Sequence, residues 1–143
     1  MDLRSQLIEF EGWENAAYPD PLTGADPWTI GVGHTGTEVH KALVWGDELI
    51  GATLDADIAE KTAQVRKALP WFDQLNEPRK AVIVGMCFQL GLNGMLGFKR
   101  TLASVRDERF EDAANGMLTS KWAKQTPKRV RRLAAQMASG SWQ

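Results

Sequence analysis

The sequence is poor in residues that form covalent or metal cross-links. Its 143 residues include one cysteine, Cys87, and two histidines, His34 and His40. A single thiol cannot form an internal disulfide bond, and these three side chains lack the spacing of a metal site. We therefore expect no metal centre, and a buried structural thiol at Cys87, because this residue lies within an apolar run.

Long hydrophobic runs are also missing. The longest nearly unbroken apolar stretch, residues 81–88, has eight residues, whereas a helix that spans a bilayer needs about 20. The first residues lack both the basic segment and the apolar segment of a signal peptide. The sequence thus predicts neither membrane insertion nor an export signal.

Net charge is nearly absent from the whole chain but not from its parts. The total is −1, yet residues 1–60 hold twelve acids and two bases, whereas residues 61–143 hold six acids and fifteen bases. Six of those bases crowd into residues 121–132. Such asymmetry indicates either that the second part meets a polyanion or that two lobes of opposite charge attract each other.

The first part of the chain alternates between two kinds of pattern. Residues 3–10 repeat apolar side chains at helical spacing, and Gly12 should end this helix. Residues 13–36 are punctuated by proline and glycine and predict a short antiparallel hairpin or a three-stranded sheet. A further helix is expected from Asp55 until Pro70 ends it, while residues 37–54 are ambiguous.

Helices dominate after Pro78. Residues 79–90 are apolar on nearly all sides, which predicts a central buried helix. Three glycines should break it: Gly91, Gly94 and Gly97. Shorter helices are expected over residues 98–106, 110–122 and 128–139. Thr126-Pro127 is a typical helix start, with Thr as the cap and Pro at the first helical position.

Strands and helices are therefore segregated along the chain, which is the α+β pattern. We expect a single domain of residues 1–143. A small β-containing lobe should cover about 13–54, and a helical lobe about 70–143, with the N-terminal helix 2–12 belonging to the helical lobe. The helix in between should join the two lobes.

Two carboxylates flank the predicted hairpin. Glu11 stands at the end of the first helix, and Asp20 follows after a gap of eight residues. Paired carboxylates suit glycoside hydrolysis, in which one donates a proton to the leaving oxygen and the other acts on the opposite face of the sugar. The spacing also fits a plainer interpretation, in which Glu11 is a surface helix residue and Asp20 caps a turn.

Further residues around this pair favour the catalytic interpretation. Together with Tyr18 and the string from Trp28 to His34, the two carboxylates resemble the active-site signature of the phage lysozymes of T-even endolysin type, glycoside hydrolase family 24. The resemblance resumes over about residues 72–142. It includes Phe88-Gln89-Leu90-Gly91, Gln125-Thr126-Pro127 and Gly140-Ser141-Trp142. The turn between Asp20 and Thr29 is three residues longer than in the family pattern.

The resemblance implies a lysozyme-like fold and a muramidase activity. Such an endolysin hydrolyses the β-1,4 bond between N-acetylmuramic acid and N-acetylglucosamine in bacterial peptidoglycan, with inversion. It implies that Glu11 is the general acid, that Asp20 activates or positions the attacking water, and that Thr29 helps to hold that water. No cofactor is required, because the two carboxylates supply the chemistry.

The resemblance also sets expectations for partners and location. The partner is cell-wall peptidoglycan, without nucleic acid, and the protein should be a monomer. We expect it to be made in the host bacterial cytoplasm and to act on periplasmic peptidoglycan after release.

Other family positions match residues outside the hairpin or at its end. The residues expected to contact the sugars are Thr35, Phe88, Gln89 and Thr101, with Gln125 as a weaker candidate and Trp28 as a candidate for stacking on a ring. Plainer interpretations exist for three of them: a core position for Phe88, a polar helix position for Gln89 and a helix cap for Thr101. His34 matches a structural histidine that pairs with an acid of the long helix, and Glu60 is our candidate for that acid.

Two other functions stay open. A lytic transglycosylase acting on the same bond would need Glu11 but not Asp20, so the presence of Asp20 favours hydrolysis. A non-enzymatic module that binds the wall or nucleic acid would use the basic segment 121–132 to neutralise phosphates. That second alternative explains the charge asymmetry but leaves Glu11, Asp20 and Thr29 unaccounted for.

Arg129 matches the family's arginine that pairs with the catalytic glutamate. We predict that Arg129→Ala weakens both stability and activity, since it removes the positive partner of Glu11. The thermal midpoint and the lysis of permeabilised cells measure the two effects. A variant that keeps the wild-type midpoint and the wild-type lysis would show that this pairing is wrong.

Overall fold

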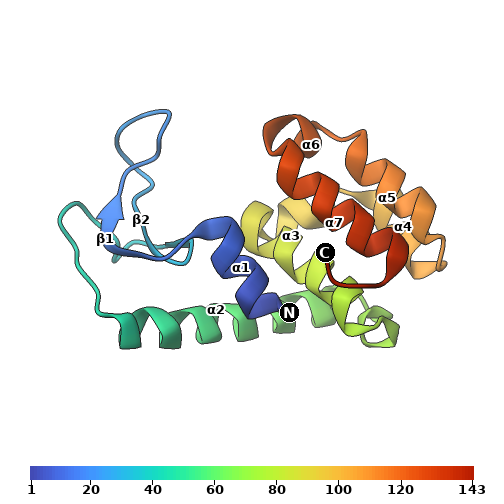
Figure 1. Cartoon of the computed structure of the whole chain (residues 1–143), viewed down its shortest axis with the longest axis horizontal. Helices are drawn as coiled ribbons and strands as arrows, with labels where there is room; N and C mark the ends of the chain where they lie inside the picture. The colour runs from blue at the N-terminus through green and yellow to red at the C-terminus, as the bar shows by residue number, and fades with distance from the viewer. The chain divides into compact units, whose positions relative to one another are not determined.

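The computed structural model describes all 143 residues, which divide into two units (Figure 1). Residues Arg4–Glu60 form the first, which we call the β unit. Met1–Leu3 and Lys61–Gln143 form the second, the helical unit. Helix α2, Asp47–Ala68, is one continuous helix that contributes residues to both.

The β unit contains the hairpin that the sequence predicts. Helix α1, Leu3–Glu11, ends where the Gly12 N–H donates to the Ile8 carbonyl at 2.9 Å, with Gly12 at φ +79°. Three strands follow: β1 (Glu14–Tyr18), β2 (Thr29–Gly31) and β3 (His34–Thr35). They form one antiparallel sheet in the order β1-β2-β3. Both the end of the helix and the three-stranded sheet are confirmed.

Helix α1 differs from the prediction in the unit to which it belongs. We expected it in the helical lobe, but from Arg4 onward it clusters with the β unit. Arg4 Nε donates to Asp55 Oδ1 at 2.8 Å, and its guanidinium lies against Gly51, where an added Cβ would stand 3.3 Å from Nη2. These contacts hold α1 on the first half of α2.

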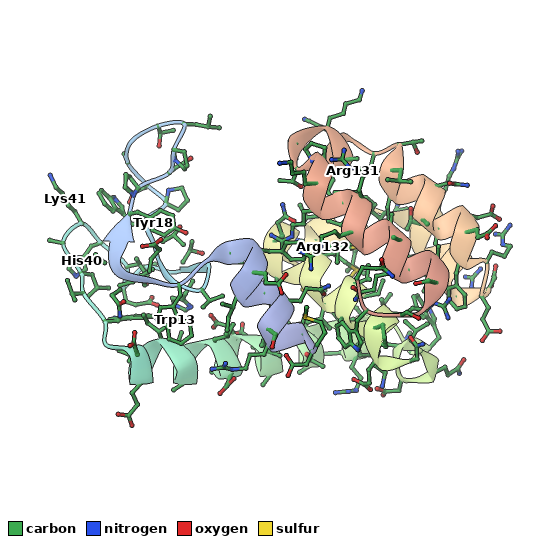
Figure 2. The ribbon with its side chains drawn as sticks, in the orientation of Figure 1. Trp13, Tyr18, His40, Lys41, Arg131 and Arg132 are labelled. Carbon is green, nitrogen blue, oxygen red and sulfur yellow. The ribbon has the colours of Figure 1, made fainter.

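Helix α2 begins earlier than predicted, at Asp47 instead of Asp55. Ile50 and Leu54 are both buried, so they extend the apolar face by two turns. Asp47 Oδ1 accepts hydrogen bonds from Asn15 Nδ2 and Trp13 Nε1, each at 2.9 Å, and these bonds lower the pKa of Asp47. Figure 2 shows Trp13 beside the first turn of this helix. The start of α2 is thus defined by contacts with β1 and the segment before it.

The helical unit is built around helix α3, Glu77–Leu96. Its residues from Ala81 to Cys87 are all buried, which confirms the central helix and the buried thiol. Gly91, at φ 77° and ψ 165°, kinks α3 without ending it. The other elements are a 3-10 turn (η1, Phe72–Gln74), α4 (Lys99–Arg106), α5 (Phe110–Leu118), α6 (Lys121–Gln125) and α7 (Pro127–Ser139).

One helix boundary and one helix cap in this unit were predicted wrongly, while the start of α7 at Pro127 is confirmed. The expected helix 110–122 is divided between α5 and α6, because the Ser120 hydroxyl accepts from the Ala123 N–H at 3.2 Å and caps a new helix. Thr126 does precede α7, but its side chain makes no cap bond. Its hydroxyl donates to the Trp122 carbonyl at 3.4 Å instead.

The border between the units coincides with the change in charge. The β unit holds eleven acids and two bases, and the helical unit seven acids and fifteen bases, so their net charges are −9 and +8. Each unit also has buried apolar side chains of its own, such as Ile30 and Ile50 in the first and Ile83 and Met117 in the second. The charge asymmetry therefore follows the structural division of the chain.

No single helix combines the length and hydropathy of a membrane span. Helices α3 and α4 reach those values only together, and they are bent by 104°.

Arg79 joins four parts of the helical unit. Its Nε donates to the Met137 carbonyl at 2.8 Å and its Nη2 to the Ala138 carbonyl at 3.0 Å, near the end of α7. Its guanidinium lies 3.5 Å from the ring centroid of Phe110, at the start of α5. A Cβ at Gly140 would stand 2.9 Å from Arg79 Cζ, so the glycine permits this approach. One side chain of α3 thus satisfies carbonyls that the end of α7 leaves open.

We predict that Arg79→Lys lowers the free energy of unfolding by about 2 kcal/mol. An ammonium group cannot donate to both carbonyls of α7 and also stack on the Phe110 ring. Urea denaturation measures the loss. Arg100→Lys, at an exposed position of α4, serves as the matched control and should leave stability unchanged. Equal stability of the two variants would contradict the role given to Arg79.

Candidate active site

Thr29 lies at the centre of a row of polar side chains in the β unit. Strand β2 is the middle strand, and Thr29 pairs with Tyr18 of β1 on one side and with Thr35 of β3 on the other. Residues directly opposite each other in an antiparallel sheet project from the same face. Two residues of the sequence signature, Tyr18 and Thr29, and one predicted sugar contact, Thr35, are therefore neighbours on one surface.

Tyr18 also reports the position of Glu11. Burial raises the pKa of the Tyr18 phenol, and the nearby negative charges of Glu11 and Glu14 raise it further, while a side-chain hydrogen bond with Thr29 acts in the opposite direction. Figure 2 shows Tyr18 on the hairpin. The phenol thus stands close to both Glu11 and Thr29.

Glu11 packs directly on the backbone of Gly33. A Cβ at Gly33 would stand 3.0 Å from Glu11 Oε2 and 3.1 Å from its Cδ. Gly33 also has φ +64°, a conformation that favours glycine. Glycine at this position lets the carboxylate at the end of α1 lie against the turn between β2 and β3.

Asp20 follows the end of β1 and begins an exposed turn. Its Oδ1 accepts from the Leu22 N–H at 3.0 Å, which fits the predicted turn-capping role. Its own N–H donates to the Ala25 carbonyl at 3.0 Å. The residue is half-buried, so its carboxylate is held locally but remains accessible. Trp28, on the other side of this turn, is half-buried as well.

His34 pairs with two acids, and neither is the predicted Glu60. Its Nδ1 lies 2.6 Å from Asp57 Oδ2, and its Nε2 lies 2.6 Å from Glu38 Oε1. Asp57 stands on α2 nearly one turn before Glu60, in a segment that the family resemblance does not cover. The His34 ring also packs on Trp45, with 5.4 Å between centroids.

This double pairing changes the titration of the histidine. The His34 side chain is 18% exposed and that of Asp57 is 16% exposed. Burial acts to lower the pKa of His34, but the hydrogen bonds and negative charges of Glu38 and Asp57 outweigh it and raise the pKa above its ordinary value. The same contact lowers the pKa of Glu38.

The helical unit holds the other predicted sugar contacts. Gln89, on α3, is part of a network in which Trp122 Nε1 donates to its Oε1 at 3.0 Å and its Nε2 donates to Thr126 Oγ1 at 3.4 Å. Phe98 meets the Trp122 ring edge-on at 5.7 Å. Gln89 is thus a fixed residue, and Phe88 beside it is half-buried. Contact of either residue with a sugar stays a prediction.

Thr101 is the predicted sugar contact with the least exposed surface. It is 6% exposed, and its Oγ1 lies 2.5 Å from where a Cβ of Gly116 would stand. It lies within α4, so the alternative role as a helix cap is wrong. Its visible role is to pack α4 against the glycine of α5.

The predicted basic segment is only partly exposed. Lys121, Lys124, Lys128 and Arg131 face solvent, whereas Arg129 is half-buried on α7. Arg132 Nη2 donates to the Gln143 carbonyl at 2.8 Å. Figure 2 shows Arg131 and Arg132 on this helix. The pairing of Arg129 with Glu11 stays a prediction.

Sequence reasoning missed several residues of the β unit that support the site. The three residues around His34 come from the segment between residues 36 and 72, which the family resemblance does not cover: Glu38, Trp45 and Asp57. Gly33 belongs to the sequence signature, but the sequence assigned no role to it. Its contact with Glu11 joins residues that are far apart in the chain. The only local signal for this contact is the pair of closely spaced glycines after Thr29, which indicates a tight turn.

Comparisons with known proteins match most of the chain to one family. The model of the family described as phage lysozyme matches residues 8–138. The chain is 27% identical over 139 residues to "Probable T4-type lysozyme 1" of Dictyostelium discoideum, covering 80% of this chain and 82% of that protein. It is 31% identical over an alignment of 148 residues to "Peptidoglycan hydrolase gp36" of Pseudomonas phage phiKMV, covering 94% of this chain and 15% of that protein.

The raised pKa of His34 predicts a pH-dependent contribution to stability. This contribution is fully present below the ordinary histidine pKa of 6.5 and is lost as the pH rises through the raised pKa. Glu38 has a lowered pKa, so its contribution to stability is fully present above the ordinary glutamate pKa of 4.5. That contribution is lost when the pH falls through the lowered pKa.

Asp57→Asn should therefore lower the thermal midpoint most at about pH 5.5 and least at about pH 9. Thermal scans over this pH range measure the difference. His40→Gln, at the other histidine, serves as the control, and its midpoint at about pH 5.5 should lie closer to that of the wild type than the midpoint of Asp57→Asn does. A loss for Asp57→Asn that is equal at both pH values would refute the charge pairing.

Proposed function

This chain belongs to the phage lysozyme family, and we propose that it hydrolyses the β-1,4 bond between N-acetylmuramic acid and N-acetylglucosamine in bacterial peptidoglycan. The family match includes both candidate carboxylates and all three strands. The names of two relatives, a lysozyme and a peptidoglycan hydrolase, support the same substrate. The observation that carries the proposal is the contact of the Glu11 carboxylate with Gly33, in the sheet whose middle strand presents Thr29.

In this proposal Glu11 is the general acid. It gives its proton to the glycosidic oxygen as the bond from that oxygen to C1 of N-acetylmuramic acid breaks. The leaving sugar departs with a free 4-hydroxyl group. Because Glu11 stands at the end of a helix and against a glycine backbone, its side chain has little freedom to turn away from the bond.

Asp20 is the partner that activates water. Its carboxylate takes a proton from a water molecule, and the water oxygen bonds to C1 on the face opposite the leaving oxygen. We assign to Thr29 the task of holding that water by its hydroxyl group. Tyr18, which hydrogen-bonds Thr29, would fix the direction of that hydroxyl.

Residues of the helical unit are assigned to binding. We propose that Phe88 and Gln89 contact the sugars, since the Trp122 and Thr126 bonds hold Gln89 in one orientation. Positioning residues held by neighbouring bonds lose less freedom when a substrate binds. Thr35 of the β unit, exposed at the end of β3, is assigned the same role.

The test is the clearing of Gram-negative cells whose outer membrane has been permeabilised. We expect Glu11→Gln and Asp20→Asn each to reduce clearing by about 100-fold or more, because each removes a proton-transfer group. Glu14→Gln, at an exposed glutamate of β1, is the matched control and should clear at the wild-type rate. Thermal midpoints near that of the wild type would show that the variants fold.

Product analysis distinguishes the alternatives. Hydrolysis leaves a reducing end on N-acetylmuramic acid, whereas a transglycosylase leaves a 1,6-anhydro end. Inversion of a β bond releases the α-anomer first, which proton NMR can detect. Clearing that survives Glu11→Gln, or a wild-type protein that clears no cells, would overturn the proposed function.

A further inference from the structure

We propose that the turn from Asp20 to Pro27 is a positioning element for hydrolysis: the Leu22 N–H holds one carboxylate oxygen of Asp20, so that the other is presented to the attacking water. This inference rests on the proposed function, in which Asp20 activates that water. It adds a task for residues that neither the sequence signature nor the family match assigns.

The turn holds Asp20 by three of its polar groups. Oδ1 accepts from the Leu22 N–H at 3.0 Å, the main-chain carbonyl accepts from the Gly24 N–H at 2.8 Å, and the main-chain N–H donates to the Ala25 carbonyl at 3.0 Å. Oδ2 makes no bond within the chain. The carboxylate is therefore fixed at one oxygen and open at the other.

The turn is closed by its own residues. Thr23 Oγ1 accepts from the Ala25 N–H at 3.2 Å and donates to the Asp26 carbonyl at 3.3 Å. Gly24 adopts φ +67°, which lets the chain reverse so that Ala25 faces Asp20. The proline rings at positions 21 and 27 restrict φ at both ends. These local bonds set the geometry of the Asp20 carboxylate.

The turn has no core to stabilise it. All residues from Pro21 to Pro27 are exposed, and the Leu22 side chain is 95% exposed. A Cβ at Gly24 would meet no atom within 4 Å. A substitution at Gly24 therefore acts through backbone conformation alone, and the core of the β unit is left intact.

Fixing one oxygen affects the chemical step. As the water oxygen bonds to C1, its proton passes to Oδ2, while the C1 bond to the leaving oxygen breaks and that oxygen takes the Glu11 proton. A carboxylate that rotates freely about its last bond offers Oδ2 in the right direction for only part of the time. Misplacement by about 1 Å can cost about 100-fold in rate. The turn should thus influence kcat more than KM.

The test compares two substitutions at Gly24. Valine is disfavoured at positive φ, whereas asparagine tolerates it. We expect Gly24→Val to lower kcat by about tenfold, with KM within about twofold of wild type. Gly24→Asn should keep a kcat close to that of the wild type. Release of reducing ends from soluble, uncross-linked peptidoglycan strands measures both constants. Thermal midpoints should change little, because the turn is exposed.

Gly46→Val is the matched control. Gly46 is exposed, has an ordinary φ, and a Cβ there would also meet nothing within 4 Å. This variant should keep the wild-type kcat. If Gly24→Val does not fold, Thr23→Val, which removes the two hydroxyl bonds of the turn, is expected to show the same selective loss of kcat.

Three results would overturn the inference. They are an unchanged kcat in Gly24→Val, an equal loss in Gly24→Asn, and a change confined to KM. Failure of the proposed function is a separate outcome, since it would appear as activity retained in Glu11→Gln and Asp20→Asn. If those two variants lose activity while Gly24→Val keeps it, only the role of the turn is wrong.

Discussion

The backbone of two glycines, Gly31 and Gly33, is the constraint on which the candidate site is built. Both have positive φ, which turns the chain sharply enough for His34 to pair back onto Ile30 and for Thr35 to stand beside Thr29. Both also admit close neighbours: Ile50 Cγ2 lies 3.2 Å from a Cβ position at Gly31, and the Glu11 carboxylate approaches Gly33 in the same way. A side chain at either position would displace α2 or the candidate acid.

The residue after this turn fastens the hairpin to the rest of the β unit. His34 links β3 to α2 through Asp57 and to the following loop through Glu38. A small sheet of short strands has little apolar surface with which to fix its own position. Hydrogen bonds between oppositely charged side chains therefore stabilise the hairpin where apolar burial is limited. They also make the stability of this part of the protein sensitive to pH.

The helical unit relies on a different balance of forces. Its central helix is buried along two turns, and its polar contacts serve to join helix ends, as Arg79 does for α7 and Asn76 for the first turn of α3. The Gln89, Trp122 and Thr126 network belongs to the same kind of structure. The residues that we propose to bind sugar in this unit thus stand on packed helices, whereas Asp20, which we propose to activate water, stands in a turn closed by local hydrogen bonds.

Local signals in the amino-acid sequence were sufficient for much of the fold. The end of α1 at Gly12, the three-stranded sheet and the start of α7 at Pro127 follow from residues that act within a few positions, and the apolar run of α3 predicts its burial. Long-range contacts settled the rest. The start of α2, the unit that α1 joins and the acids that flank His34 each require knowledge of which distant segment lies nearby. Glycine at position 33 permits a close contact, but only folding brings Glu11 there.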